Sequence, residues 1–471
     1  MSDFNVTTVG IGPATKRARV DPMNVRTSLD RLLCLFAPVE AGEGLTALLL
    51  MMNLFLLMTA YYIIKPVRES LILGGAGPEI KAYAGAAAAL MFVVLVPLYG
   101  KVASRLNRLR LINGVTAFFA SNLVVFYELG LHNVSFGVVF FVWAGLFNLM
   151  LVAQFWAFAN DVYTQEQGKR LFAIIGIGSS LGAIFGAGVA GRLFMTAGVY
   201  PMLLIAAALL GVCMVLSNWV HYRESNCVHP TENDELLKSS AGGFQLVFKD
   251  RYLLLIALLI MLSNVVNTTG EFILAKSVSE HASVAAAGAA AETMTRQEYI
   301  GQFYAEFYFW VNLTGACLQM FVVSRVMKYA GIGPTLFLLP LVALGGYTFL
   351  SFAPVLSVIH AAKIAENSTD YSIQNTARHA LFLRTSRDAK YKAKTAIDGF
   401  FWRAGDALSA VIVLAGTTLA FDVRSFARAN TIVTAAWMCV AAAIVWVRTT
   451  EGVSESPEAG PLLDDSANAD A

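Results

Sequence analysis

Charged side chains inside a long apolar segment are the first feature of this sequence that could bind a ligand. The segment that ends YYIIKPVRES carries Lys65 and Arg68 three residues apart, so both cations share one face of a helix. Tyr61 and Tyr62 lie one turn earlier, and Pro66 frees a backbone carbonyl. Two cations beside aromatic rings could bind a phosphate and stack a base. Alternatively, both long side chains could extend to the membrane surface.

A second polar face occurs in the sequence NVVNTTGEF. Asn264, Asn267 and Glu271 recur at spacings of three and four residues, so they lie on one side of a helix. Such a face either hydrogen-bonds to neighbouring helices or forms a coupling site. We predict that Glu271, or else Glu306 in EYIGQFYAEFYFW, binds a proton or balances the cations. Gly270 is expected to loosen the helix.

A third group of charges lies nearer the C-terminus. Lys363 and Glu366 are three residues apart and can neutralise each other on one helix face. The segment HALFLRTSRDAKYKAK that follows is strongly basic, which is typical of cytoplasmic loops that contact lipid. Asp398, Arg403 and Asp406 are predicted to form a partly paired set on the next helix.

Several kinds of chemistry find no support in the sequence. The six histidines are isolated, and the five cysteines show no CxxC pair, so we expect neither a metal site nor a disulfide framework. No Walker A loop or nucleophile elbow occurs, so we expect no bound cofactor and no ATP hydrolysis. A net charge of +2 gives no reason to expect nucleic acid as a partner. An integral-membrane enzyme or a receptor is a remaining alternative, but no Asp, His or Cys cluster favours the enzyme.

The elements that hold these residues must be membrane-spanning helices. The chain is 57% hydrophobic and 14% charged, whereas a soluble domain is about a quarter charged. Apolar segments of about twenty residues predict spanning helices rather than barrel strands. The expected spans are 45–66, 82–100, 110–130, 135–160, 170–196, 201–221, 252–275, 301–324, 334–352, 355–378, 395–420 and 429–447.

The distribution of Lys and Arg predicts the orientation. With the N-terminus inside, about 24 basic residues fall on the cytoplasmic side and about 8 outside, as the positive-inside rule requires. Both termini are therefore expected to be cytoplasmic. About forty mostly polar residues precede the first apolar segment, so we expect that segment to act as an uncleaved signal-anchor. Short loops favour a bacterial inner (plasma) membrane.

The polar segment 222–251 divides the chain into two halves with weak internal similarity. LYGKVASRLNRLRLI and MFVVSRVMKYAGIGP end corresponding helices, and QGKRLFAIIGIGSSLG and YKAKTAIDGFFWRAGD begin corresponding helices. We predict an all-α polytopic membrane protein of about twelve helices in two six-helix halves, which is a major-facilitator-like architecture. The predicted divisions are a cytoplasmic polar and basic tail (1–44), two six-helix bundles (45–221 and 252–449), a cytoplasmic linker (222–251) and an acidic disordered tail (450–471).

Four segments together resemble a known family. YYIIKPVRESLIL, FWAFANDVYTQEQGKRLF, EYIGQFYAEFYFWVNLTGA and YSIQNTARHALFLRTSRDAKYKAKTAID resemble the ATP/ADP translocases of plastids and obligate intracellular bacteria. The resemblance extends from residue 45 to residue 450. It implies a major-facilitator-like fold that exchanges nucleotides without hydrolysing them.

The resemblance carries over to particular positions. The family's lysine in the first helix matches Arg68, and its basic pair before the eleventh helix matches Lys392 and Lys394. The family's glutamates in the fourth and seventh helices fall near Ala144 and Asn267 instead. These departures indicate a divergent bacterial branch, for which transport of an anionic, phosphorylated solute is the broader expectation.

We therefore expect a secondary transporter that moves a nucleotide or related anion by alternating access. A proton-coupled transporter of an unrelated small solute is the alternative. The expected partners are a small anionic substrate and the lipid bilayer, with the chain acting as a monomer. The predicted substrate-binding residues are Lys65, Arg68, Tyr62, Asn267, Arg378, Lys392 and Lys394, and the predicted coupling or counter-charge residues are Glu271, Glu306 and Asp398.

Overall fold

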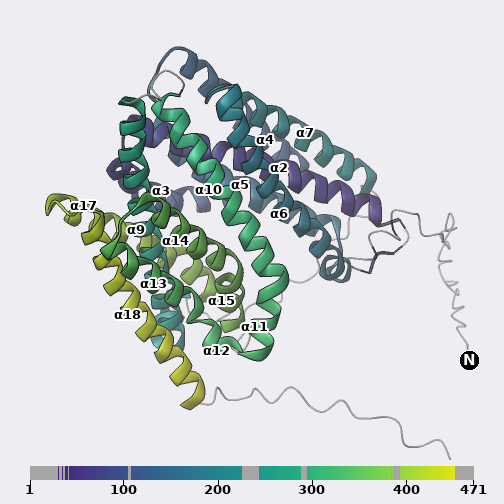
Figure 1. Cartoon of the computed structure of the whole chain (residues 1–471). Coiled ribbons are helices and arrows are strands. Elements are labelled where there is room, and N and C mark those ends of the chain that lie inside the picture. Colours follow the sequence, from purple (N-terminus) through teal and green to yellow (C-terminus); the bar gives the residue numbers. More distant parts are fainter. Residues whose placement is uncertain are drawn as a thin grey trace, which may run out of the picture.

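The computed structural model describes an all-helical chain (Figure 1). Residues 38–40, 42–103, 108–224, 243–287, 294–382 and 393–450 are described, together with residues 30, 34 and 385. Within these ranges no strand occurs. Backbone groups in a bilayer must bond within their own segment, which explains why long helices are the only spanning element.

The N-terminal half contains six long helices. They are α2 (Gly44–Gly75), α3 (Pro78–Ala103), α4 (Arg108–Leu131), α5 (Gly137–Val162), α6 (Gln165–Thr196) and α7 (Pro201–Glu224). Local sequence explains several of their ends. Proline begins α3 and α7, where its missing N–H is harmless. Thr164 begins α6 with a capping box, in which its side chain and that of Gln167 each bond to the other's backbone N–H.

The C-terminal half forms six further helical rods, several of them built from consecutive α- and π-helical segments. These are α9 (Arg251–Ala287), α10–η2–α11 (Arg296–Leu318, Gln319–Val323, Ser324–Tyr329), α12–α13 (Ile332–Thr335, Leu338–Phe352), α14–η3–α15 (Leu356–Thr369, Asp370–Gln374, Asn375–Leu381), α16–η5–α17 (Lys394–Ala396, Ile397–Phe401, Trp402–Thr418) and α18 (Val423–Thr450). A short helix, α8 (Gly243–Lys249), precedes them.

Ten helices of the described chain are long and apolar enough to cross a membrane. The helix α3 and the rod α14–η3–α15 complete the twelve rods. The predicted all-α polytopic fold in two six-helix halves is therefore confirmed. The predicted tails and most of the predicted linker lie outside the described residues, so the domain boundaries stay predictions.

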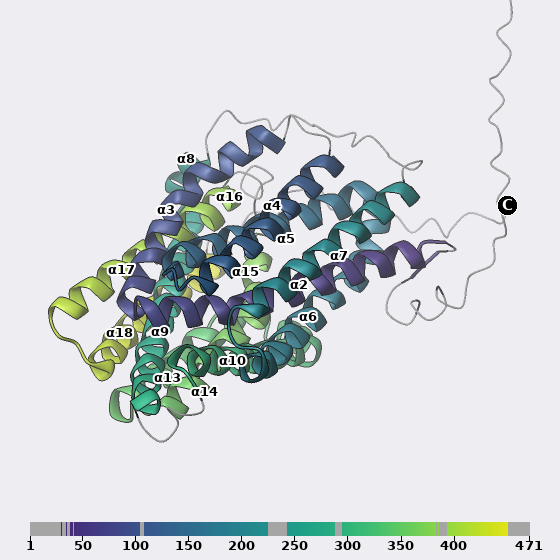
Figure 2. The ribbon, with the colours of Figure 1, turned by 90° about the horizontal axis from the view of Figure 1, so that it is seen from above.

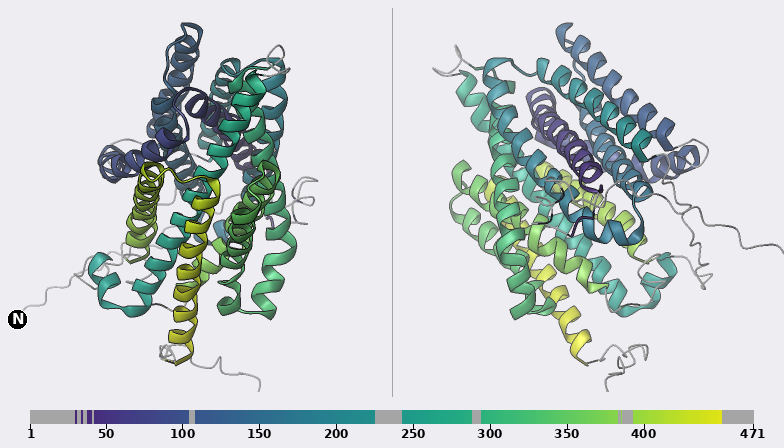
Figure 3. Two further views of the ribbon diagram at one scale, coloured as in Figure 1. Left: turned by 60° about the vertical axis from the view of Figure 1, so that its left-hand side comes forward. Right: turned by 90° about the vertical axis from the view of Figure 1, so that its right-hand side faces the viewer.

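The two halves meet at one end of the molecule and diverge towards the other (Figures 1 and 3). The joined end contains the last turns of α2 and α6 and the start of α10. There the hydroxyl of Ser70 donates to the carbonyl of Gln297 over 2.6 Å. Phe194 lies directly over Gly301, where an added Cβ would be only 2.1 Å from its ring. Viewed from above, α3 of the N-terminal half lies beside α17 of the C-terminal half (Figure 2).

Inside the N-terminal half, α6 packs closely on α2 through a row of glycines. A Cβ added at Gly178, Gly182 or Gly186 would approach a backbone oxygen of α2 to 2.3, 2.3 and 2.6 Å. Only glycine permits this approach, which is the small-xxx-small mode of membrane helix packing. The row therefore joins two helices of one half.

Two local expectations from the sequence are wrong. The first spanning helix continues nine residues beyond the predicted end at residue 66, through Pro66 to Gly75, so Lys65 and Arg68 lie well inside it. Gly270 does not loosen its helix, because α9 is continuous from Arg251 to Ala287. A Cβ at Gly270 would instead be 1.8 Å from the hydroxyl oxygen of Tyr347. Glycine is needed at this position to admit that hydroxyl.

Candidate functional site

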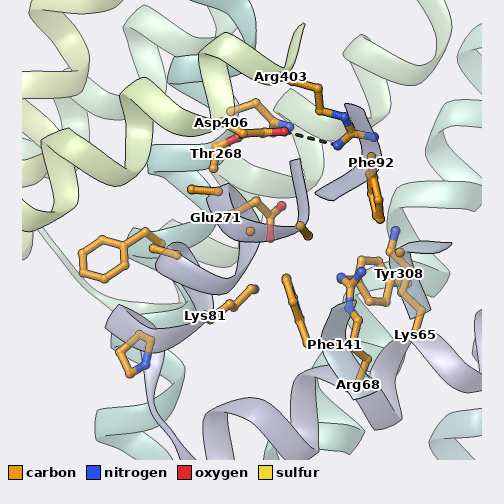
Figure 4. Close-up of a pocket in the computed structure, with 18 of the residues that line it drawn as sticks. Lys65, Arg68, Lys81, Phe92, Phe141, Thr268, Glu271, Tyr308, Arg403 and Asp406 are labelled. Atoms are coloured by element: carbon orange, nitrogen blue, oxygen red, sulfur yellow. Dashed lines mark hydrogen bonds and ion pairs between the residues drawn. The ribbon is translucent and has the colours of Figure 1, made fainter. Parts of the chain in front are cut away.

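A cavity of about 270 Å³ lies between the two halves (Figure 4). Helices α2, α3 and α5 form one side, and α9, α10, η3 and α17 form the other. Its charged lining residues are Lys65, Arg68, Lys81, Glu271, Arg403 and Asp406. A cavity shared by both halves is the position at which alternating access places a substrate.

The ammonium group of Lys65 lies among four tyrosine rings. Its Nζ is 3.9 Å from the ring centroid of Tyr308, 5.2 Å from that of Tyr62, 5.9 Å from that of Tyr371 and 6.0 Å from that of Tyr61. Ring faces attract a cation without neutralising its charge. Among the described residues no carboxylate pairs with Lys65, so this cation is available to an anion that enters the cavity.

The other two cations of the N-terminal side share one buried carboxylate. Glu69 has no exposed surface. Its Oε1 accepts from Nε of Arg68 over 3.1 Å, and its Oε2 is 2.6 Å from Nζ of Lys81. The hydroxyl of Tyr308, on the opposite half, is 3.5 Å from the same Oε1. Glu69 therefore holds α2, α3 and α10 together electrostatically.

On the C-terminal side a fully buried lysine organises the predicted polar face of α9. Nζ of Lys363 donates to Oδ1 of Asn267 over 3.0 Å and lies 3.1 Å from Oε2 of Glu366, which confirms the predicted pairing. Oε1 of Glu271 is 3.9 Å from the same Nζ and accepts from the amide of Asn367 over 3.0 Å. Asn267 and Glu271 face the cavity, with Lys363 behind them.

An ion pair of α17 also lies on the C-terminal side of the cavity. Arg403 lies 3.3 Å from Asp406, so this part of the predicted paired set is confirmed. The carboxylate of Asp406 also accepts from Asn264 over 2.8 Å and from Thr268 over 3.2 Å. The guanidinium of Arg403 lies 4.8 Å from the ring centroid of Phe92 on α3, which links the two halves.

A second polar cavity of about 220 Å³ lies next to the first, and Tyr371 lines both. Its other lining residues come from α6, α10, η2 and α15 and include Asn312, Asn375 and Thr376. Beyond it, Arg378 donates to Oδ1 of Asn375 over 3.1 Å. The two cavities thus follow one another from the joined end towards the diverging end.

Two of the predicted substrate-binding residues, Arg378 and Lys394, belong to the diverging end. The guanidinium of Arg378 is 5.0 Å from the ring centroid of Trp402. Nζ of Lys394 is 5.8 Å from the ring centroid of Phe382, at the start of the eleventh rod. Lys392 lies outside the described residues. This end therefore contributes basic side chains beyond the central cavity.

Two predicted counter-charge residues lie away from the central cavity. Asp398 is exposed in η5. Glu306 is exposed on the side of α10 that faces away from the cavity, where it lines a separate groove against α6. Of the three predicted counter-charge residues, only Glu271 lines the central cavity.

The sequence did not lead us to predict Glu69 and Lys81, which form the buried ion pairs of the N-terminal side. Glu69 directly follows Arg68, but the predicted helix stopped short of both residues. Lys81 lies just before the predicted span 82–100, whereas the structure places it in the first turn of α3. The adjacent opposite charges in PVRES were the signal that could have identified Glu69.

The charged groups that line the central cavity leave a positive excess. Four cations and two carboxylates face it, and four minus two gives a formal charge of +2. Counting the buried Glu69 as well lowers the sum to +1. An uncompensated positive charge at membrane depth is unfavourable unless an anion is near. The cavity is therefore suited to an anionic solute.

The family model of the Major Facilitator Superfamily matches residues 44–365, which is more than half of the chain. The chain belongs to the major facilitator superfamily. This assignment agrees with the two six-helix halves and with a cavity between them. It identifies the chain as a multi-pass membrane protein of a transporter superfamily.

Curated relatives of this superfamily member are carriers from Chlamydia. The chain is 22% identical to ADP,ATP carrier protein 1 of Chlamydia pneumoniae over 458 residues, with 80% of this chain and 85% of the relative covered. It is 23% identical to ADP,ATP carrier protein 1 of Chlamydia trachomatis over 442 residues, with 77% and 80% covered. The predicted resemblance to the ATP/ADP translocases is thus confirmed as a distant relationship.

Solved structures share the fold of this superfamily member. The nucleoside transporter NupG superposes with a TM-score of 0.59 at 13% identity, over 85% of this chain and 98% of that chain. A POT family transporter in complex with 5-aminolevulinic acid gives a TM-score of 0.59 at 11% identity, over 87% and 96%. At such identities the likeness concerns the fold alone.

Proposed function

We propose that this protein is a secondary transporter that moves a nucleotide or a related phosphorylated anion, with ATP/ADP-type exchange as its specific form. The observation that carries the proposal is the cationic cavity between the halves, where Lys65 has no carboxylate partner among the described residues. The ADP,ATP carriers to which the chain is distantly related support nucleotides as the anion class.

Binding in the cavity would use two kinds of contact. Phosphate oxygens would accept hydrogen bonds from Lys65 and from Arg68, whose planar guanidinium suits bidentate phosphate recognition. The ring of Tyr62 would help to orient Lys65, and Asn267 would offer an amide from the opposite half. The partly exposed ring of Tyr371, between the two cavities, provides a surface on which a base could stack.

Glu69 gives the transport cycle a competing anion. Its single carboxylate pairs with both Arg68 and Lys81. A phosphate that reaches Arg68 must share that cation with Glu69, so binding would weaken the contacts between α2, α3 and α10. Those contacts lie near the joined end, and loosening them would favour opening there. Alternating access then follows from the competition of two anions for one set of cations.

The orientation of the protein is also part of the proposal. Basic residues of α11, α15 and α16 lie at the diverging end, and the positive-inside rule places such an end in the cytoplasm. The cavities would then open to the cytoplasm, with both termini on that side of an inner (plasma) membrane. Arg378, Lys392 and Lys394 would attract the anion towards the path. We propose that the monomer is the transporting unit, since the cavity is complete within one chain.

Exchange into liposomes tests the proposed function. Purified protein is reconstituted into vesicles with or without internal ADP, and uptake of labelled ATP, ADP and small organic phosphates is followed. We expect uptake that requires an internal phosphorylated anion and that falls strongly in the Lys65→Met variant. Failure of every anion to move, or full activity of Lys65→Met, would contradict the proposal.

The geometry also favours one second candidate, a proton-coupled transporter of another small solute. Glu271 is a cavity carboxylate whose neighbour Lys363 is already paired with Glu366. Such a carboxylate could take up and release a proton as the halves rock. This candidate predicts uptake that does not require internal nucleotide and that is abolished by a protonophore. Loss of this uptake in Glu271→Gln would favour the candidate over exchange.

A further inference from the structure

A groove of about 680 Å³ runs between α6 and α10 on the outside of the helix bundle. It shares no lining residue with the central cavity. Residues of α6 contribute most of the lining, and α2 contributes Phe55. A groove on the outer surface of a bundle of membrane-spanning helices is accessible to lipid.

Small residues produce the groove, and large apolar residues border it. Gly188, Gly191 and Ala305 line its floor, where Cβ atoms added at the two glycines would only reach ordinary contact distance of α10, at 3.4 and 3.7 Å. Leu181 and Phe185 stand at its sides and are about half exposed, at 50% and 54%. Such a slot between two helices suits an acyl chain.

Two opposite charges lie together at one end of the groove. Gly191 of α6 faces Ala305 of α10, so the next residue of each helix, Arg192 and Glu306, lies at nearly the same depth. Within the described residues neither side chain makes a hydrogen bond or an ion pair, either with the other or with a third group. A ligand that carries both signs could therefore pair with both side chains.

The length of the groove matches one leaflet. Arg192 is four residues from the end of α6 at Thr196, which places it about 6 Å inside that end at 1.5 Å per residue. Leu181 lies eleven residues further along, or about 17 Å deeper. Half of a hydrocarbon core is about 15 Å thick. The charged end therefore lies near a headgroup layer, and the apolar part extends over the depth of one acyl layer.

We propose that this groove binds one zwitterionic phospholipid. Its phosphate accepts from Arg192, its ammonium group donates to Glu306, and one acyl chain lies over Gly188 between Phe185 and Phe309. An anionic lipid would satisfy Arg192 but would leave Glu306 unpaired. A primary ammonium, as in phosphatidylethanolamine, can donate directly to the carboxylate, whereas a trimethylated choline headgroup cannot.

The position of the groove gives the lipid a structural consequence. Helix α6 belongs to the N-terminal half and α10 to the C-terminal half, and both take part in the joined end. A lipid held by one charge from each half favours the state in which these helices lie together. Its affinity for the protein should therefore depend on whether this end is joined.

Native mass spectrometry of the full chain released from mixed vesicles tests the proposal. This measurement does not depend on transport activity. The vesicles contain equal amounts of phosphatidylethanolamine, phosphatidylcholine and phosphatidylglycerol. We expect one retained phosphatidylethanolamine, with retention reduced about tenfold in Arg192→Gln, because a charged hydrogen bond is lost. In Glu306→Gln we expect the preference over phosphatidylglycerol to disappear.

The matched control is Arg428→Gln. Arg428 is exposed on α18, five residues inside the end of its helix at Val423, and lies outside the groove. It should retain phosphatidylethanolamine as the parent does. Equal retention of all three lipids by the parent overturns the proposal, as does unchanged retention in both groove variants. Melting curves of the variants exclude unfolding as the cause of any loss.

Discussion

Replacing the carboxylate of Glu69 by an amide should destabilise the protein strongly and should raise its affinity for anions. In the Glu69→Gln variant the guanidinium of Arg68 and the ammonium of Lys81 lose their shared counter-ion. The shape of the side chain hardly changes, so the perturbation is almost purely electrostatic. Tyr308 keeps a polar partner at position 69.

The expected size of the effect follows from burial and distance. Glu69 has no exposed surface, and Nζ of Lys81 is 2.6 Å from its Oε2. At an effective dielectric constant of about 20, unit charges about 4 Å apart attract each other by about 4 kcal/mol. Removing one partner of a buried pair typically lowers stability by about 3–5 kcal/mol. We expect a loss of unfolding free energy in that range.

Denaturant titration of the purified protein in detergent micelles gives the change in unfolding free energy. The double variant Glu69→Gln/Lys81→Met removes one cation as well and should recover at least half of the loss. Inorganic pyrophosphate should raise the melting temperature of Glu69→Gln more than that of the parent, because it replaces the missing anion. A single variant within about 1 kcal/mol of the parent, the size of an ordinary substitution, would refute the role given to Glu69.

The remaining predictions concern one cation and two glycines. Lys65→Met should weaken binding of an anionic substrate about ten- to hundredfold, because a charge-assisted contact contributes about 1.5–3 kcal/mol; a titration of the purified protein measures the dissociation constant. Gly270→Ala should lower the unfolding free energy by about 1–3 kcal/mol through overpacking, since its Cβ would be 1.8 Å from the hydroxyl oxygen of Tyr347. Tyr347→Phe in the same chain should restore part of that loss. Gly182→Ala should lower the melting temperature as well, because its Cβ would be 2.3 Å from the carbonyl oxygen of Phe55.

Each of these variants has a matched control. Gly211→Ala lies in α7 with no atom within 4 Å of the added Cβ, so it should leave stability nearly unchanged. Lys276→Met removes a lysine that bonds to the carbonyl of Phe421 and does not line the cavity, so anion affinity should be kept. Equal effects in a variant and its control would mean that the contact named here is not the cause.

The two halves place buried charge networks of different composition on the two sides of one cavity. In the N-terminal half one carboxylate, Glu69, serves two cations. In the C-terminal half one cation, Lys363, serves Glu366 and Glu271. The excess charges of the two networks are therefore opposite in sign and face each other across the cavity. A substrate that carries phosphate would interact first with the N-terminal network.

Hydropathy was enough to predict the twelve rods, and the polar segment 222–251 together with the weak internal similarity predicted the two halves. A bilayer requires about twenty apolar residues for each crossing, and this requirement is local in sequence. The glycine row of α6 was also predictable as a packing face, since spacing four defines one helix side. Lys65, Arg68, Asn267 and Glu271 were chosen for the same local reason, and the structure places all four around one cavity.

Only the tertiary structure decided which charges pair between helices. Glu69 and Lys81 lie twelve residues apart on different helices, and no sequence period links them. Glu306 and Glu271 are both glutamates within apolar helices. Glu271 lines the cavity, whereas Glu306 lines the groove on the outside of the bundle. The direction in which a charged side chain points depends on how its helix is rotated against its neighbours. That rotation is set by contacts such as Gly182 on Phe55 and Gly270 on Tyr347, which join residues distant in the chain.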